Sequence, residues 1–115
     1  MMARPSRGDI YWVNFDPARG TEQGGRRPAL VVQNDRGNRS SSYTVVVAVS
    51  SAPLPRTYPF TVLLNQGDGG LPRQGHVNCA QLLTIDQGRL EEYIGTLSAD
   101  RMVQVSDALR YELDL

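Results

Sequence analysis

Residues 20–35 read GTEQGGRRPALVVQND and join two kinds of sequence. The first half is polar and glycine-rich, which lets the backbone take positive φ angles and approach a ligand closely. The second half, Ala29–Gln33, is a short apolar run typical of a buried strand. Arg27 precedes Pro28, so its backbone is predicted to be extended and to begin that strand. Two arginines, Arg26 and Arg27, are therefore expected where a polar loop meets the core.

Further strands are predicted on either side of this stretch by apolar, β-branched runs bounded by turn residues. A turn is predicted at residues 34–38, NDRGN, and a loop at residues 65–75, which hold four glycines and a proline. The predicted strands cover residues 10–15, 29–33, 43–50, 60–64 and 76–81, with 82–85 extending or following the last of them.

The last quarter of the chain changes to a helical period. Ser98 is a helix cap, and Met102, Val105, Leu109 and Leu113 fall on one stripe of an amphipathic helix. A short helical turn is predicted over residues 87–90, capped by Asp86. The fold class is therefore mostly β (α+β): a small, strongly bent sheet or barrel of about five to seven strands, with a C-terminal helix. Residues 1–115 are expected to form a single domain.

Charge and composition narrow the classes of function. Net charge is zero, but residues 1–75 hold nine arginines against five acids, and there is no lysine. A neutral protein is a poor candidate for non-specific duplex binding, whereas a local arginine cluster suits an anionic ligand held at one place. The single cysteine forms no internal disulfide, the N-terminus has no apolar signal segment, and no apolar run approaches the roughly 20 residues of a membrane span. These features favour the cytoplasm and no membrane association.

Several stretches together resemble the MazF/PemK family of toxins. They are Arg7-Gly-Asp-Ile-Tyr11, Gly20-Thr-Glu-Gln-Gly-Gly-Arg-Arg-Pro28, Leu30-Val-Val-Gln-Asn-Asp35, Gln81-Leu-Leu-Thr-Ile-Asp86, Arg89-Leu90 and Ile94-Gly-Thr-Leu97. The resemblance covers roughly residues 7–113. It implies a sequence-specific, metal-independent endoribonuclease that cuts single-stranded RNA, folded as a small SH3-like, CcdB-like barrel. It also implies a homodimer neutralised by a MazE-like antitoxin, for which charge predicts an acidic, extended segment.

The resemblance also implies roles for individual residues, with no cofactor and no metal. Arg27 matches the catalytic arginine, and Ser50 matches a catalytic hydroxyl that is commonly a threonine. Whether Ser50 or Ser51 faces the phosphate is left open. The residues expected to contact RNA are Glu22, Gln23, Arg26, Asn34, Ser51 and Gln81.

The remaining candidate groups receive structural interpretations. The only histidine, His76, is expected to end a strand at the surface, and Cys79 is expected to be a small core residue. Tyr11 and Trp12 are assigned to the core in preference to base stacking. The acids at separate turns are interpreted as turn formers and arginine partners, without metal-ligand spacing. Arg56 and Arg73 lie in predicted loops that can close over a bound strand.

Two other functions stay open on sequence grounds. One is a CcdB-like toxin that binds DNA gyrase without cutting RNA, and this reading depends on a tryptophan near the C-terminus. The chain ends Tyr111-Glu-Leu-Asp-Leu115, and its only tryptophan is Trp12. The other is an SH3-like binding module without activity.

Overall fold

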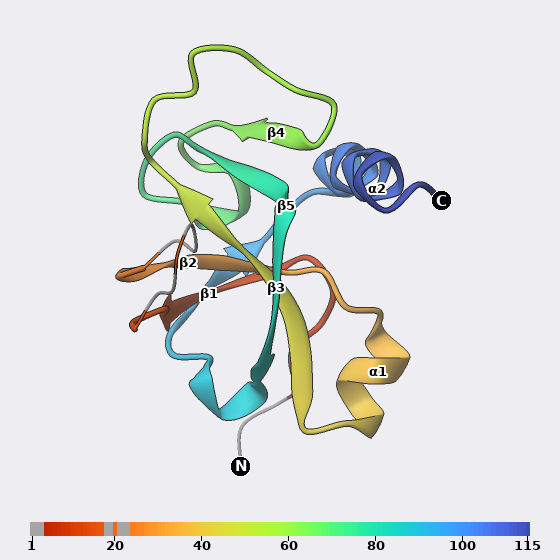
Figure 1. The fold of residues 1–115 in the computed structure, drawn as a ribbon. Coiled ribbons are helices and arrows are strands. Elements are labelled where there is room, and N and C mark those ends of the chain that lie inside the picture. The colour runs from red at the N-terminus through yellow and green to blue at the C-terminus, as the bar shows by residue number, and fades with distance from the viewer. Residues whose placement is uncertain (1–3, 18–19, 21–23) are drawn as a thin grey trace.

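The computed structural model describes residues 4–17, 20 and 24–115. Its six strands form one antiparallel, strongly curled sheet in the order β4-β5-β3-β2-β1-β6 (Figure 1). The strands are β1 (Asp9–Asn14), β2 (Arg26–Val31), β3 (Tyr43–Ser50), β4 (Thr61–Leu64), β5 (Gly75–Asp86) and β6 (Tyr93–Thr96). The predicted fold class, a mostly β barrel-like sheet with a C-terminal helix, is confirmed.

The longest strand, β5, bends the sheet because it pairs with two strands in succession. Its first half pairs with both β3 and β4, so that Val77 lies between Val49 and Val62. Its second half pairs with β3 alone, after a register shift between Val47 and Val49. Residues 76–81 and 82–85, for which the sequence left continuity open, therefore belong to one strand.

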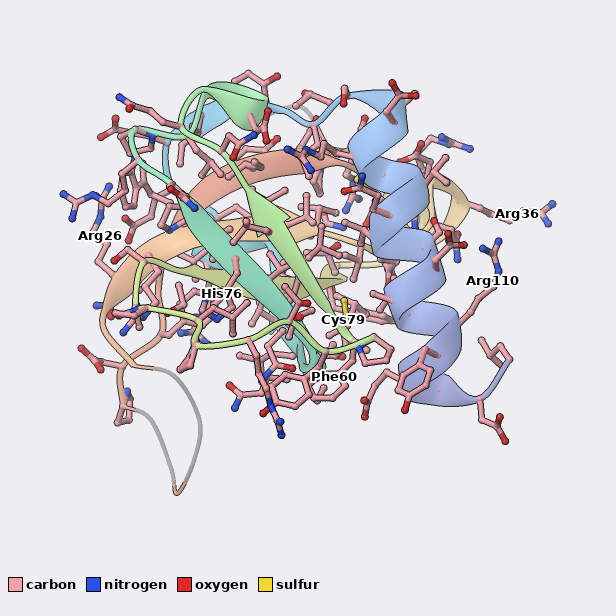
Figure 2. All side chains as sticks on the ribbon, turned by 90° about the horizontal axis from the view of Figure 1, so that it is seen from above. Arg26, Arg36, Phe60, His76, Cys79 and Arg110 are labelled. Carbon is pink, nitrogen blue, oxygen red and sulfur yellow. The ribbon has the colours of Figure 1, made fainter. Side chains whose placement is uncertain are left out.

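The curled sheet buries a hydrophobic cluster on each face. Strand alternation sends Ile10, Leu30 and Val47 to one face and Val13, Val31 and Val46 to the other, all at most 1% exposed. The first face is covered by α2 (Ala99–Leu113), which lies across it in Figure 2, with Cys79 on the covered side. The second face packs Tyr11 and Leu90. Cys79 is fully buried, which confirms its assignment to the core.

The C-terminal helix begins as predicted, but its buried stripe differs. The Ser98 side chain caps it by accepting from the Arg101 backbone N–H. Val105 and Ala108 are buried, whereas Leu113 is 51% exposed because the helix extends beyond the sheet. The predicted turn after β5 is also present, as η2 (Gln87–Arg89) with Asp86 accepting from Gly88 N. No helix in the described part of the chain is long and apolar enough to cross a membrane.

Two local expectations were wrong, and one strand was not predicted. Residues 34–38 were expected to form a turn, but they begin the helix α1 (Asp35–Ser40). The Asn34 side chain accepts a hydrogen bond from the Gly37 backbone N–H and so caps this helix. The strand β6 was not predicted; it pairs with β1 and packs against η1 (Asp68–Gly70). His76 was expected at the surface but is 8% exposed, because its strand lies between β3 and β4.

Candidate active site

Arg27 occupies the second position of β2, where the loop becomes a strand. Its backbone pairs with Val13 of β1, and its Nε donates to the Gly24 carbonyl oxygen at 2.7 Å. Within residues 4–17, 20 and 24–115, no carboxylate forms an ion pair with Arg27 and neither Nη has a hydrogen-bond partner. This guanidinium is held by a strand, and its two Nη groups are available to bind a phosphate in a bidentate manner.

The two serines at the end of β3 lie on opposite faces of the sheet. Ala29 pairs with Ala48, and continuing that antiparallel register by two residues sets Ser50 opposite Arg27. Ser50 is 4% exposed, and its Oγ accepts from Ala52 N at 3.2 Å. Ser51 is exposed and lines a pocket together with Arg27. Alternation thus gives Ser50 to the Arg27 face and Ser51 to the other.

The pocket beside these strand ends has a volume of about 260 Å³ and lies over the first hydrophobic cluster. Three arginines, one from the loop before β5, border it: Arg26, Arg27 and Arg73. Its walls and floor are apolar: Trp12, Pro28, Val49, Leu71 and Pro72. Two neutral polar side chains complete it: Ser51 and Gln74. Cations therefore surround an apolar cavity at one end of the sheet.

Arg26 lies over this pocket's aromatic wall. Its guanidinium carbon is 4.7 Å from the centre of the Trp12 ring. Its Nε is 2.8 Å from Glu91 Oε1, and an Nη is 3.9 Å from Glu92 Oε1. Trp12 is half-buried, so its assignment to the core was wrong. The alternation of β1 held no signal for this, because Trp12 shares its face with the fully buried Ile10.

The other expected RNA contacts are spread over the molecule. Gln81 is half-buried in β5, in the register shift between Leu82, the partner of Val47, and Val77, the partner of Val49, whereas the partner of Ser50 is His76. Asn34 caps α1, beyond the end of β2 that lies away from Arg27. At a rise of about 3.3 Å per residue along a strand, this position is roughly 20 Å from Arg27. Glu22 and Gln23 lie outside the described residues. The structure therefore brings together Arg26, Arg27, Ser50 and Ser51 at the strand ends, and it separates Asn34 from them.

Burial shifts the pKa values of three titrating side chains. Burial lowers the pKa of His76, the cross-strand partner of Ser50, so its imidazole is neutral at pH 7. Burial raises the pKa of the Cys79 thiol to about 11, with Glu112 adding to the shift, which leaves the thiol protonated and unreactive. Burial and then Asp9 raise the pKa of Tyr11 to about 12. None of these groups supplies a charge near Arg27 at neutral pH.

The acids have different partners. Asp68 pairs with Arg101 at 3.0 Å, as expected of an arginine partner. Asp9 instead accepts from the hydroxyls of Thr96 at 2.8 Å and Tyr11 at 3.3 Å, and so ties β1 to β6. Within the described ranges, no three His, Cys, Asp or Glu side chains gather where they could hold a metal ion.

Comparison with known proteins assigns this chain to a family. Residues 6–113 match the family described as PemK-like, MazF-like toxin of type II toxin-antitoxin system, and the chain belongs to that family. It is 37% identical over 113 residues to endoribonuclease MazF9 of Mycobacterium tuberculosis, covering 95% of this chain and 96% of that protein. It is 34% identical over 109 residues to endoribonuclease MazF of Staphylococcus epidermidis, covering 95% and 91%.

Solved structures agree with the family assignment. A crystal structure of MazF from Deinococcus radiodurans superposes with a TM-score of 0.82 at 31% identity, over 99% of this chain and all of that one. An endoribonuclease in complex with its cognate antitoxin, from a mycobacterial species, gives 0.80 at 28% identity over 96% of both chains. The predicted family is therefore confirmed by sequence and by fold.

Proposed function

We propose that this protein is a sequence-specific, metal-independent endoribonuclease, the toxin of a type II toxin–antitoxin pair. The observation that carries the proposal is Arg27, which is fixed in a strand and free of acidic partners in the described residues, with Ser51 beside it in the same pocket and Ser50 opposite it in the continued register. Family membership and relatives named as endoribonucleases support it. The proposed location is the cytoplasm.

The chemistry needs no protein nucleophile, because RNA carries its own. The 2′-oxygen attacks the adjacent phosphorus, and the bond from phosphorus to the 5′-oxygen breaks. The 2′-proton passes to a base and the leaving 5′-oxygen takes up a proton, so the products are a 2′,3′-cyclic phosphate and a 5′-hydroxyl. The enzyme's task is to align these atoms and to stabilise charge on the phosphate.

Arg27 is assigned the stabilisation of that charge. Its two Nη groups donate to the non-bridging oxygens. Ser50 is assigned a hydrogen bond to the phosphate or to the 2′-hydroxyl, from the rigid position that the Ala52 N–H gives its Oγ. Ser51, Arg26 and Gln81, together with Glu22 and Gln23, are proposed to contact the neighbouring nucleotides.

The proposal includes three partners. The substrate is single-stranded RNA, whose unpaired bases expose their edges to polar side chains. The inhibitor is a MazE-like antitoxin that presents an acidic, extended segment to the arginines around the pocket, and the solved complex of a structural neighbour with its antitoxin supports this pairing. The third partner is a second copy of the chain, in a homodimer.

The test is cleavage of a long, weakly structured RNA in EDTA by purified protein, with mapping of the 5′ ends. Cuts at one recurring short word, ending in 5′-hydroxyls and lost with Arg27→Ala, are expected. Ser50→Ala should lower the rate more than its neighbour Ser51→Ala, which serves as the matched control. If folded, antitoxin-free protein leaves the RNA intact, the proposal is wrong.

The gyrase-binding alternative has little support in the structure. The only tryptophan lies in the arginine-lined pocket, and the described C-terminal residues Tyr111, Leu113 and Leu115 are exposed around the end of α2. Inhibition of gyrase supercoiling by protein that leaves RNA intact would revive that alternative.

A further inference from the structure

Of the three arginines that border the pocket, Arg26 alone is paired with acids within the described part of the chain. Its Nε lies 2.8 Å from Glu91 Oε1, and an Nη lies 3.9 Å from Glu92 Oε1. The proposed function assigns this guanidinium to RNA, yet its Nε already donates to a carboxylate. The ion pair therefore has to be exchanged before Arg26 can give all its donors to a phosphate.

We propose that Glu91 is an internal competitor for RNA: its carboxylate holds Arg26 against Trp12, and a phosphate of the RNA must displace that carboxylate to bind Arg26. The inference rests on the proposed function, because it assumes that the ligand of this strand end is RNA. It gives a role to an acid that the proposed chemistry does not use, which is to limit the affinity of the site for polyanions.

Strand register places Arg26 beside the ring that it covers. Arg26 pairs with Asn14 at the start of β2. Trp12, two residues before Asn14 on β1, is therefore its diagonal neighbour on the same face, within reach of a long side chain. The guanidinium carbon lies 4.7 Å from the centre of the Trp12 ring, a cation–π contact that adds to the ion pair. Two contacts thus hold Arg26 along β1 in the RNA-free protein.

The backbone of the two acids is fixed to β1. Glu91 N donates to the Trp12 carbonyl oxygen at 2.8 Å, and Trp12 N donates to the Glu92 carbonyl oxygen at 2.9 Å. These two bonds fasten the segment before β6 to the centre of β1. When Arg26 turns toward a phosphate, the acids stay behind, and the phosphate approaches two negative charges that have lost their partner. Both the broken ion pair and the repulsion oppose binding.

The test measures RNA affinity after removal of one acid at a time. The probe is a dye-labelled oligonucleotide that spans a mapped cut, with 2′-deoxyribose at the cut to prevent cleavage. A set of mixed-sequence oligonucleotides serves if no cut is found, and anisotropy follows the binding. Glu91→Gln keeps the shape and the backbone bonds of residue 91 but removes its charge. Glu92→Gln is the matched control, because it removes the same charge from the next residue, whose carboxylate lies farther from Arg26.

The expected gain in affinity is modest because the pair is exposed. The side chains of Arg26 and Glu91 are 47% and 42% exposed, and exposed ion pairs are weak in water. The Kd of Glu91→Gln should therefore lie about 2- to 5-fold below that of Glu92→Gln. Equal Kd values would overturn the inference, because the two acids would then act only through net charge.

Repeating the comparison in Arg26→Ala protein tests the mechanism. Without Arg26 the carboxylate has nothing to withhold from RNA, so the two glutamine variants should bind the oligonucleotide equally well in this background. A difference between Glu91→Gln and Glu92→Gln that persists without Arg26 would overturn the inference, because Glu91 would then act on RNA by another route.

Single-turnover cleavage supplies a second readout and separates this inference from the proposed function. The gain of Glu91→Gln should appear in the half-saturating RNA concentration and not in the rate at saturation, and the reverse would overturn the inference. If the wild type cleaves and the two variants bind alike, the competition is wrong and the proposed activity stands. If nothing is cut but the Arg26-dependent difference in Kd is found, the proposed activity is wrong and the competition stands. Absence of binding to every oligonucleotide overturns both.

Discussion

Polar side chains gather near both ends of β2, and the two groups differ in how many hydrogen bonds and ion pairs they form within the protein. We call Arg26, Arg27, Ser50, Ser51 and Arg73 the arginine end, and Gln33, Asn34, Asn38, Thr44 and Gln87 the asparagine end. Figure 2 places Arg26 on one side of the molecule and Arg36, in α1, on the other. Both ends fall within stretches that resemble the same family, so resemblance alone does not separate their roles.

The asparagine end is a closed network. Asn38 is fully buried, and its Oδ1 accepts from Thr44 Oγ1 at 2.7 Å and from Gln33 Nε2 at 2.9 Å. Gln87 Nε2 donates to three carbonyl oxygens, those of Asn38, Ser41 and Tyr43. These bonds hold α1 and η2 on the start of β3. Polar groups that are satisfied in this way stabilise the fold.

The arginine end is open. Arg27 has no acidic partner within the described ranges, Ser51 is exposed, and a pocket separates Arg73 from Trp12. Arg26 is held by Glu91 and Trp12, whereas the two Nη groups of Arg27 have no partner within the described ranges. The comparison teaches that open and closed hydrogen-bond networks, more than residue type, distinguish a candidate binding site from a structural polar cluster.

The largest expected effect is on catalysis at the arginine end. Arg27→Ala should lower kcat about 10²- to 10³-fold, as for the loss of one donor to a developing oxyanion. Its unfolding free energy should change by less than about 0.5 kcal/mol, because Arg27 makes no ion pair in the described residues. Single-turnover cleavage and urea denaturation measure the two quantities. A large loss of stability would assign Arg27 to the fold instead.

The opposite pattern, lost stability with unchanged catalysis, is expected for Asn38→Ala at the asparagine end. Removing this amide leaves Thr44 and Gln33 without their partner, and should cost about 1–3 kcal/mol in the free energy of unfolding. Under conditions where the variant is fully folded, kcat should match the wild type. Urea denaturation followed by circular dichroism gives the first value. A kcat reduced as much as that of Arg27→Ala would contradict the division between the two ends.

A smaller effect is expected for Asn34→Ala, which tests the one predicted RNA contact that lies at the asparagine end. Its Oδ1 accepts from Gly37 N at 2.8 Å, and loss of an N-cap costs about 1 kcal/mol. Asn34→Asp keeps the cap and should keep the stability. If Asn34 also binds RNA, kcat/KM should fall in both variants. An unchanged kcat/KM would leave it with the structural role alone.

The smallest effect is expected for His76, and it is confined to acid pH. Burial holds its folded-state pKa below the ordinary value of about 6.5, so the unfolded chain binds the proton more readily. The contribution of a neutral His76 to the free energy of unfolding is therefore fully present above about pH 6.5. It is lost as the pH falls from there through the lower folded-state pKa. The wild type should lose more unfolding free energy between pH 7.5 and pH 5.5 than His76→Gln. Equal losses would place the imidazole in contact with solvent.

Much of this fold could be predicted from the sequence, because its signals are local. The β-branched run 43–50 became β3, Ser98 and Asp86 cap the elements predicted for them, and Pro28 lies in the strand that Arg27 enters. The sequence-based predictions failed where the structure of a segment depends on a neighbouring strand. The strand β6 is four residues long and depends on pairing with β1, and His76 is buried by the strands on both sides of it.

The candidate site divides in the same way. The sequence by itself determined the family, the place of Arg27 at the start of a strand, and the presence of serines at the end of another, because these follow from chain order and backbone preference. Only the tertiary structure decided that Ser50, in place of Ser51, shares the face of Arg27, that Asn34 is a helix cap, and that Trp12 and Arg73 meet at one pocket. Those relations join residues that are far apart in the chain, and they depend on strand register and on the curl of the sheet, which only the packed core sets.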